Sequence, residues 1–285
     1  MSDKLDLIMS AVTSNRMDKF YKPLLKLRTP KKCDITVIIP VRGRIFFLAP
    51  LIKHLNLARN KSTKKINILI VEHSYFPQFK QECSAMAIDY HWIPCQKEDV
   101  FNKCLCHNVG AMLNRNSQYY LFHDSDCLVF DDFFNNLRLE DLVTQTFTKR
   151  RLLYLNEATT AKVIDREIAI TEIVLDGPDI VVGGIGAPGG SILIHNNLFF
   201  DVGGFDPELF NGYSVEDGFF WYKVLTLKEI SSSDNEVLHM YHKNLSGTNE
   251  KMNIMAFIFE AFAALSDEEK TKFVTFKKNV LNDIL

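Results

Sequence analysis

Short apolar runs alternate with amphipathic stretches over the first half of the chain. The length and composition of the runs predict buried strands, and the stretches between them place apolar side chains on one helical face. The order is strand, helix, strand, strand, helix, strand, which is typical of a nucleotide-binding α/β fold with a mixed, mainly parallel sheet flanked by helices. The strands are predicted at residues 35–40, 66–71, 90–93 and 119–122, and the helices at residues 46–57 and 101–113.

The second half of the chain is patterned less regularly. Apolar residues after Glu216 and Asp217 predict a helix over residues 218–225. Residues 237–242 are predicted to form a strand, in which the odd spacing of His239 and His242 puts them on opposite faces. Further predicted elements are strands at 152–155 and 173–175, a helix beginning at 131–134, an amphipathic helix at 5–12, and a terminal helix opened by a capping box at 266–269.

Two carboxylates follow the aromatic run at 119–122. Asp124 and Asp126 are separated by Ser125, and ligands of open α/β sheets bind outside the carboxyl ends of the strands. Two acids at such a position can hold a hard divalent cation, which in turn could hold a diphosphate. The alternative is a solvated turn, because Asp and Ser both favour turns.

Charged side chains follow the first two predicted strands as well. Arg42 and Arg44 come after the first strand and Glu72 comes after the second, so all three are expected at the same edge of the sheet. Arginines can pair with phosphate, and a carboxylate can accept the N–H of a pyrimidine base. An ordinary surface ion pair would use the same residues.

A glycine-rich segment covers residues 183–190 and contains G-x-G-x-x-G. A dinucleotide fingerprint should follow a first strand and open a helix, whereas this segment contains Pro188 and precedes an apolar run. We therefore reject the dinucleotide interpretation. Two alternatives stay open, namely a mobile loop over a substrate and a static turn.

Glu216 and Asp217 sit at the start of the helix predicted at 218–225. Acidic residues at this position can simply compensate the helix dipole. The functional alternative is a general base that is directed at a bound hydroxyl group.

Composition narrows the classes of function and compartment. Lysine and arginine (33) nearly balance aspartate and glutamate (35), and this balance does not favour nucleic acid as a partner. No pair of the six cysteines has C-x-x-C spacing, so reduced thiols and a cytoplasmic location are expected. Cys104, Cys106 and His107 fall within a helical pattern, which argues against a zinc site there. The sequence shows neither a signal peptide nor a membrane span.

Taken in order, these features resemble metal-dependent glycosyltransferases of the GT-A fold, and especially the β1,4-galactosyltransferase and chondroitin-polymerase-like families. The resemblance covers roughly residues 35–245. The segments that carry it are Pro40-Val41-Arg42-Gly43-Arg44, Phe101-Asn102-Lys103 with Asn108-Val109-Gly110, Asp124-Ser125-Asp126, Gly189-Gly190-Ser191, Gly203-Gly204-Phe205, Glu216-Asp217 and His242. Tyr213 stands where the family has a tryptophan that contacts sugar, which leaves the donor and acceptor preference open.

The resemblance implies inverting transfer of a sugar, such as galactose or an N-acetylhexosamine, from a UDP-sugar to a carbohydrate hydroxyl group. It implies that Asp126 and His242 bind Mn²⁺ or Mg²⁺, that Asp217 is the base and that Glu216 positions the acceptor. It also implies a GT-A domain at 35–245 between an N-terminal extension (1–34) and a C-terminal helical segment (246–285). The residues implied in donor binding are Pro40, Arg42, Arg44, Glu72, Lys103, Asp124, Ser125 and Gly190.

Two other functions remain as alternatives at this point. A sugar nucleotidyltransferase also joins such a sheet to a metal and a diphosphate, but its glycine-rich loop should follow the first strand, and Val41-Arg42-Gly43-Arg44 matches it poorly. A non-catalytic carbohydrate-binding module would bind glycans without metal or nucleotide.

Overall fold

The structure is a computed structural model of the 285-residue chain. It describes residues 3–16, 18–23, 32–137, 139, 145–147, 151–185, 189–212, 215–229, 231–232, 235–243 and 250–284. The strands are β1 (Cys33–Val41), β2 (Ile66–Ser74), β3 (Asp89–Pro94), β4 (Ser117–His123), β5 (Cys127–Val129), β6 (Gln145–Phe147), β7 (Arg151–Leu155), β8 (Ile180–Ile185), β9 (Ser191–His195), β10 (Ser231–Ser232) and β11 (Glu236–His239). The helices are α1 (Asp3–Ser14), α2 (Asp18–Tyr21), α3 (Ile45–Lys61), α4 (Lys80–Ala85), α5 (Lys103–Leu113), α6 (Glu157–Ile164), α7 (Asn196–Asp201), α8 (Glu216–Leu227), α9 (Glu250–Ala263) and α10 (Asp267–Asn282), with a 3₁₀ turn at Ile170–Glu172.

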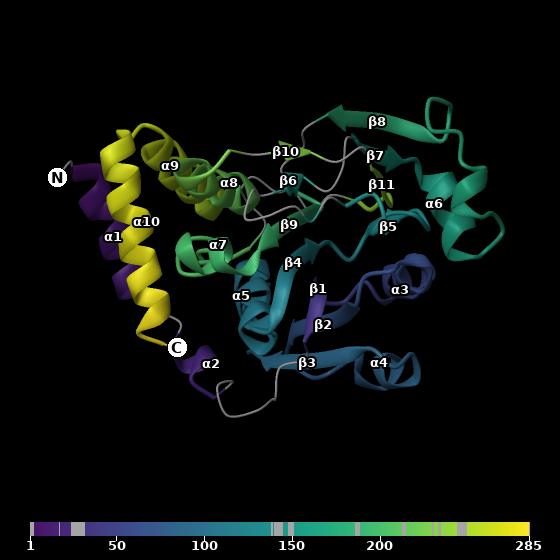
Figure 1. The fold of residues 1–285 in the computed structure, drawn as a ribbon, viewed down its shortest axis with the longest axis horizontal. Coiled ribbons are helices and arrows are strands. Elements are labelled where there is room, and N and C mark those ends of the chain that lie inside the picture. The colour runs from purple at the N-terminus through teal and green to yellow at the C-terminus, as the bar shows by residue number, and fades with distance from the viewer. Residues whose placement is uncertain are drawn as a thin grey trace.

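Within the described residues, the main sheet has seven strands in the order β10-β6-β9-β4-β1-β2-β3. β1 pairs in parallel with β2 on one side and with β4 on the other, and β2 pairs in parallel with β3. After β1 the chain adds β2 and β3 on one side of β1, and then adds β4 on the other side. The strand order therefore reverses between β1 and β4, which is the switch point of the sheet. A smaller sheet, β5-β11-β7-β8, adjoins it (Figure 1).

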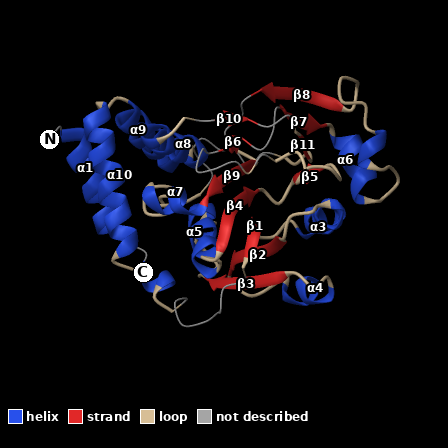
Figure 2. Cartoon of the chain, viewed as in Figure 1, coloured by secondary structure: helices blue, strands red, loops and turns tan. Residues whose placement is uncertain are grey.

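Helices α5 and α3 lie on opposite sides of the parallel strands (Figure 2), and alternate residues of β1 pack toward one or the other. Ile38 belongs to the core that includes α5 and the C-terminal helices, whereas Val37 and Ile39 belong to the core that includes α3. Successive side chains of a strand point to opposite faces of the sheet. Because both faces of this sheet are buried, its strands are continuous apolar runs.

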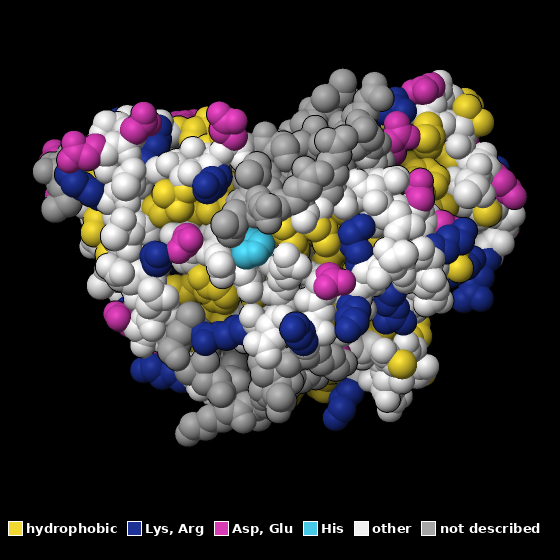
Figure 3. Space-filling view, in the orientation of Figure 1, with side chains coloured by type: hydrophobic (Ala, Val, Ile, Leu, Met, Phe, Trp, Pro, Cys, Tyr) yellow, Lys and Arg dark blue, Asp and Glu magenta, His cyan; other side chains and the backbone are white. Residues whose placement is uncertain are grey.

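The N-terminal segment contributes to the protein core. Leu5, Ile8 and Val12 of α1 are buried in the same cluster as Phe262 of α9 and Phe273 of α10. Helix α1 lies beside α10 at the edge of the molecule away from β3 (Figure 1). On the face shown in Figure 3, hydrophobic side chains form separate areas with charged side chains between them.

Most predicted elements are present, with four corrections. Residues 131–134 form turns rather than a helix, and residues 173–175 follow the 3₁₀ turn instead of forming a strand. Helix α4 was not predicted, because its six residues carry only one buried apolar position. The strand predicted at 237–242 already ends at His239. None of the helices in the described ranges has the length and apolar character needed to cross a membrane.

Candidate active site

The turn after β4 lies at the switch point, directly beside the end of β1. The N–H of Asp124 donates to the carbonyl of Gly190 at 2.9 Å, and the N–H of Cys127 donates back to the carbonyl of Asp124 at 3.2 Å. These two bonds close the turn and fix it against the start of β9. The backbone thus holds Asp124 and Asp126 at the sheet edge where ligands of this architecture bind.

Asp126 is the most densely paired carboxylate of this turn, although only 4% of the residue is exposed. Its Oδ2 lies 2.5 Å from Nη1 of Arg44 and 3.2 Å from Nε2 of His242, and its Oδ1 lies 3.6 Å from Nε2 of His239. Burial alone would raise the pKa of Asp126, but the hydrogen bond with His242 and the charges of His239 and Arg44 outweigh it and lower that pKa. Asp126 is therefore anionic and ready to bind a cation.

Both histidines reach Asp126, so the prediction that they lie on opposite faces is wrong. β11 pairs with β5 so that His239 stands opposite Cys127, and the N–H of Met240 donates to the carbonyl of Asp126 at 2.8 Å. The chain then leaves strand geometry, and strand alternation no longer applies to His242. The two imidazole rings come to lie 5.2 Å apart.

Lys103 joins the turn after β4 to the start of α8. Its Nζ lies 2.9 Å from Oδ1 of Asp124, 3.0 Å from Oδ2 of Asp217 and 3.7 Å from Oε1 of Glu216. Burial alone would lower the pKa of Lys103, but the three carboxylates outweigh it and raise that pKa well above its ordinary value. The predicted donor-binding lysine is thus an ammonium ion in contact with both predicted catalytic acids.

The two adjacent acids of α8 differ in environment. Glu216 is buried, and this burial, together with the negative charge of Asp217, raises the pKa of Glu216 to about 7 in spite of Lys103. Asp217 has the closer contact with the ammonium group, at 3.0 Å against 3.7 Å. Near neutral pH, a substantial fraction of Glu216 is therefore protonated.

The glycine pair at the start of β9 fits closely around the site. A Cβ at position 189 would lie 2.5 Å from Oδ2 of Asp217, and a Cβ at position 190, where φ is +84°, would lie 3.3 Å from Sγ of Cys127. The absence of side chains at these two positions thus lets the loop approach Asp217 and Cys127 closely. Residues 186–188, in the middle of the predicted mobile loop, lie outside the described residues.

Several residues predicted to bind the donor have other partners. The buried carboxylate of Glu72 accepts hydrogen bonds from Ser74, Tyr90 and the backbone of Gln78 and Phe79. It therefore holds the loop after β2, and the predicted contact with a base has no exposed oxygen to make it. Arg42 donates to the carbonyls of Lys97 and Asp99, and Pro40 is buried within β1.

Asn108 also has a structural partner. Its side chain pairs with both the N–H and the carbonyl of Phe205, at 2.9 and 3.1 Å. This amide therefore anchors the loop that contains Gly203 and Gly204 to α5. Ser125 lies in the turn between the two acids and is partly exposed, and Tyr213 falls outside the described residues.

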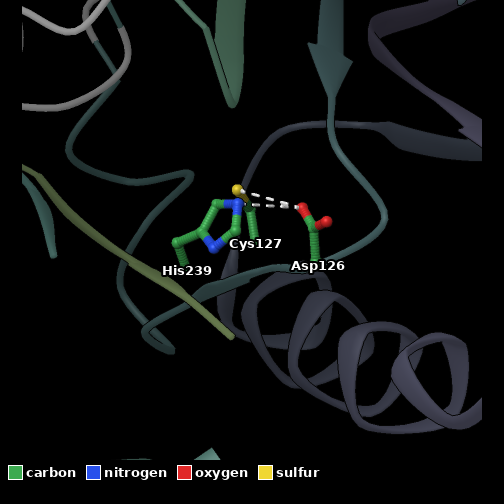
Figure 4. Close-up of side chains that lie close together, drawn as sticks. All are labelled: Asp126, Cys127 and His239. Atoms are coloured by element: carbon green, nitrogen blue, oxygen red, sulfur yellow. Dashed lines mark hydrogen bonds and ion pairs between the residues drawn. The ribbon is translucent and has the colours of Figure 1, made fainter. Parts of the chain in front are cut away.

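The sequence analysis did not include Cys127 in the site, and it assigned metal binding to His242 without His239. Cys127, His239 and Asp126 offer one sulfur, one nitrogen and one oxygen within 4.8 Å of one another (Figure 4). The sequence offered one signal for Cys127, which is its position directly after Asp126. This donor set, with His242 at the other oxygen of Asp126, fits a divalent cation.

Comparisons with known proteins agree with this architecture. The family described as glycosyltransferase like family 2 matches residues 36–258. The catalytic domain of Drosophila β1,4-galactosyltransferase 7, in complex with xylobiose, has a TM-score of 0.50 and 12% identity, over 78% of this chain and 79% of that chain. S. aureus TarS has a TM-score of 0.50 and 12% identity, over 83% of this chain and 41% of that chain.

A mutant of the Drosophila enzyme in complex with manganese, UDP-Gal and xylobiose has a TM-score of 0.43 and 14% identity, over 76% of this chain and 68% of that chain. No curated protein matches the chain. The likeness to the first Drosophila structure and to TarS shows the fold, so the predicted GT-A architecture is confirmed. Because the matched residues make up most of the sequence, the chain belongs to the glycosyltransferase like family 2 and is a glycosyltransferase.

Proposed function

We propose that this glycosyltransferase moves a sugar from a UDP-sugar to a carbohydrate hydroxyl group by a single, inverting displacement. The observation that carries the proposal is the position of Lys103. Its ammonium group contacts Asp124 on the nucleotide edge of the sheet and Asp217 at the start of α8. The predicted donor half and the predicted acceptor half of the site therefore meet at one side chain.

The donor half is built around Asp126. His239 and His242 flank this carboxylate, and the three residues would hold a divalent cation such as Mn²⁺. A cation bound there would supply positive charge to the departing diphosphate. The guanidinium group of Arg44 pairs with Asp126. Once it is released from Asp126, this group can bind a phosphate oxygen. Asp124 and Ser125 belong to the same turn, and the carbonyl of Gly190 accepts the N–H of Asp124.

The acceptor half is built around Asp217. As general base, it takes the proton of the acceptor hydroxyl group while that oxygen forms a bond to the anomeric carbon. The bond from the anomeric carbon to UDP breaks in the same step, which inverts the configuration. Lys103 favours the ionised form of Asp217 that this role requires. Glu216, of which a substantial fraction is protonated near neutral pH, can donate a hydrogen bond that positions a sugar.

The proposal is tested with a panel of UDP-sugars and glycan acceptors in the presence of Mn²⁺. Asp217→Asn keeps the shape of the side chain but cannot accept a proton. We therefore expect single-turnover transfer to fall about 10²–10⁴-fold, because general-base catalysis typically contributes that much. Calorimetry should show that the variant still binds UDP.

Glu216→Gln is the matched comparison, since it changes the neighbouring carboxyl group in the same way. Transfer that survives in Asp217→Asn but disappears in Glu216→Gln would move the base to Glu216. Unchanged transfer in both variants would contradict the mechanism. Absence of transfer from every UDP-sugar by the wild-type protein would contradict the proposed donor.

A further inference from the structure

The two oxygens of Asp126 face different groups. Oδ2 faces the guanidinium group of Arg44 and the ring of His242. Oδ1 faces Nε2 of His239 at 3.6 Å and Sγ of Cys127 at 3.9 Å. Figure 4 shows the imidazole and the sulfur together on this side of the carboxylate. One oxygen of Asp126 thus already has a fixed cationic partner, while the other forms a mixed oxygen, nitrogen and sulfur group.

The strand register places the sulfur there. Cys127 and His239 are directly opposite each other in the antiparallel pair of β5 and β11, so their side chains leave the same face of the small sheet. Gly190 leaves the space that the sulfur occupies, since a Cβ at that position would lie 3.3 Å from Sγ. The hydrogen bond from Met240 to the carbonyl of Asp126 locks the two strands in this register.

The donor atoms are buried and close enough to share one ion. Cys127 is fully buried, Asp126 is 4% exposed, and the three donor atoms lie within 4.8 Å of one another. Nδ1 of His239 is also buried and has no hydrogen-bond partner among the described residues. Nε2 is the ring nitrogen that faces Oδ1 of Asp126, so the orientation of the ring suits coordination through Nε2.

We propose that Cys127 is a ligand of the divalent cation at this site, together with Asp126 and His239, and that the site therefore prefers Co²⁺ or Zn²⁺ to Mg²⁺. This inference rests on the proposed function, because it assumes that the site holds a cation. Thiolate is a soft ligand that suits Zn²⁺ and similar ions, whereas Mg²⁺ favours carboxylate, carbonyl and water oxygens. The thiol binds as thiolate and releases its proton to solvent.

The competing account is that Cys127 only fills space, as buried cysteines commonly do. Titration of the full chain with Co²⁺ alone separates the two accounts. If the sulfur is a ligand, the wild-type protein develops a thiolate-to-cobalt charge-transfer band in the near ultraviolet. The band should be absent in Cys127→Ser and retained in Cys83→Ser, which alters a buried thiol of α4. Zn²⁺ should abolish the wild-type band at much lower concentration than Mg²⁺.

A second measurement on the wild-type protein does not depend on the folding of any variant. X-ray absorption of the Zn²⁺-loaded protein should show a sulfur neighbour at about 2.3 Å from the metal. Bound metal without a sulfur neighbour, or equal charge-transfer bands in the wild type and Cys127→Ser, would overturn the inference.

The failure of this inference can be told apart from failure of the proposed function. If UDP binding requires Mn²⁺ but no sulfur neighbour is found, the proposed cation site stands and only the role of Cys127 is lost. If the protein binds none of these cations and transfer persists in a chelator, the inference and the metal-dependent part of the proposed function both fail.

Discussion

At the scale of single residues, Glu216 and Asp217 show how neighbours in sequence acquire different properties. Both begin α8, but Glu216 is buried more deeply and lies farther from the Lys103 ammonium group. Burial and the charge of Asp217 raise the pKa of Glu216 to about 7. An acid whose pKa is raised by folding binds its proton more tightly in the folded state, so its ionisation opposes folding.

The pH dependence of stability tests this state of Glu216. Below its unfolded pKa of 4.5, both states hold the proton and the effect vanishes. As pH rises from 4.5 to about 7, only the unfolded state loses the proton, so the folded state loses up to about 3 kcal/mol and the loss stays constant above pH 7. Glu216→Gln removes the ionisation. The free energy of unfolding of this variant, measured in urea, should therefore rise relative to that of the wild type as the pH increases from 4.5 to about 7.

The exposed Glu98→Gln is the control for Glu216→Gln. A difference between Glu216→Gln and the wild type that is the same at pH 5 and pH 8 would show that Glu216 is already ionised at the lower pH. The raised pKa of Glu216 would then be wrong.

A second prediction at this scale concerns Gly189. A methyl group at this position would lie 2.5 Å from Oδ2 of Asp217, so Gly189→Ala must displace the carboxylate from its 3.0 Å contact with Lys103. Because a displacement of 1 Å in a catalytic group can lower the rate about 10²-fold, we expect a loss of transfer of that order with UDP binding retained.

Gly218→Ala is the matched control for Gly189→Ala. It also lies beside Asp217, but the nearest atom to its added Cβ is in Phe259 at 3.4 Å, an ordinary contact. Steady-state transfer measurements on both variants compare them directly. Full activity of Gly189→Ala would show that the position of Asp217 does not limit the reaction.

The sequence predicts candidate site residues that lie at the ends of elements better than it predicts residues whose position depends on tertiary contacts. Asp124, Asp126, Glu216 and Asp217 stand at element ends that local patterns predict, and the structure brings Asp124, Glu216 and Asp217 together at Lys103. The convergence of His239 with His242 was not predictable, because it depends on where β11 stops. The internal bonding of Glu72 depends on Tyr90 and on the loop after β2, which local pattern does not contain.

At the scale of elements, long apolar strands and amphipathic helices were predictable. Each buries one or both faces along its whole length, and this burial leaves a regular hydrophobic pattern in the sequence. The predicted helix at 101–113 becomes α5, which begins at Lys103 because the side chain of Asn102 caps it by accepting the N–H of Leu105. Short pieces such as α4 and β5 have too few residues to show a period. Their conformation is set by what they pack against.

The contact between α5 and β1 depends on Gly110. A Cβ at this position would lie 2.4 Å from Cγ2 of Ile38, so the helix can approach the sheet only without a side chain there. Gly110→Ala should destabilise the protein by about 1–3 kcal/mol through overpacking. Urea unfolding measures this change.

Ile38→Ala in the same background provides the control for Gly110→Ala, because it removes the atom that the new methyl group would meet. The double variant should be more stable than the sum of the two single effects predicts. Strict additivity would mean that the helix moves away from Ile38 at no energetic cost, and the close-approach argument would fail.

At the scale of the whole molecule, the C-terminal helix is connected by buried charges to the loop after α7 and, through that loop, to α8. Nζ of Lys277 in α10 lies 2.9 Å from Oε2 of Glu208 and 3.3 Å from Oδ1 of Asp206, and Nζ of Lys223 in α8 lies 2.5 Å from Oδ2 of Asp206. All four side chains are at most 3% exposed. One charge cluster thus ties α10 to the loop after α7 and to the helix that carries Asp217.

Lys277 is the member of this cluster whose loss should matter most for assembly of the two halves. Burial alone would lower the pKa of Lys277, but Glu208 and Asp206 outweigh it, so the ammonium form is favoured. Lys277→Met leaves Glu208 without its ammonium partner and Asp206 with Lys223 alone. Breaking a buried pair in this way typically costs about 3–5 kcal/mol, and we expect a loss of that size in urea unfolding.

Lys272→Met is the matched control on the same helix, because Lys272 forms an exposed pair with Glu268 one turn away. It should leave the unfolding transition nearly unchanged. Equal, small effects of the two substitutions would show that water reaches the cluster and that α10 is held by apolar packing alone. A large effect confined to Lys277→Met would show that buried charge fixes the C-terminal helix against the loop after α7 and against α8, which carries the proposed catalytic acids.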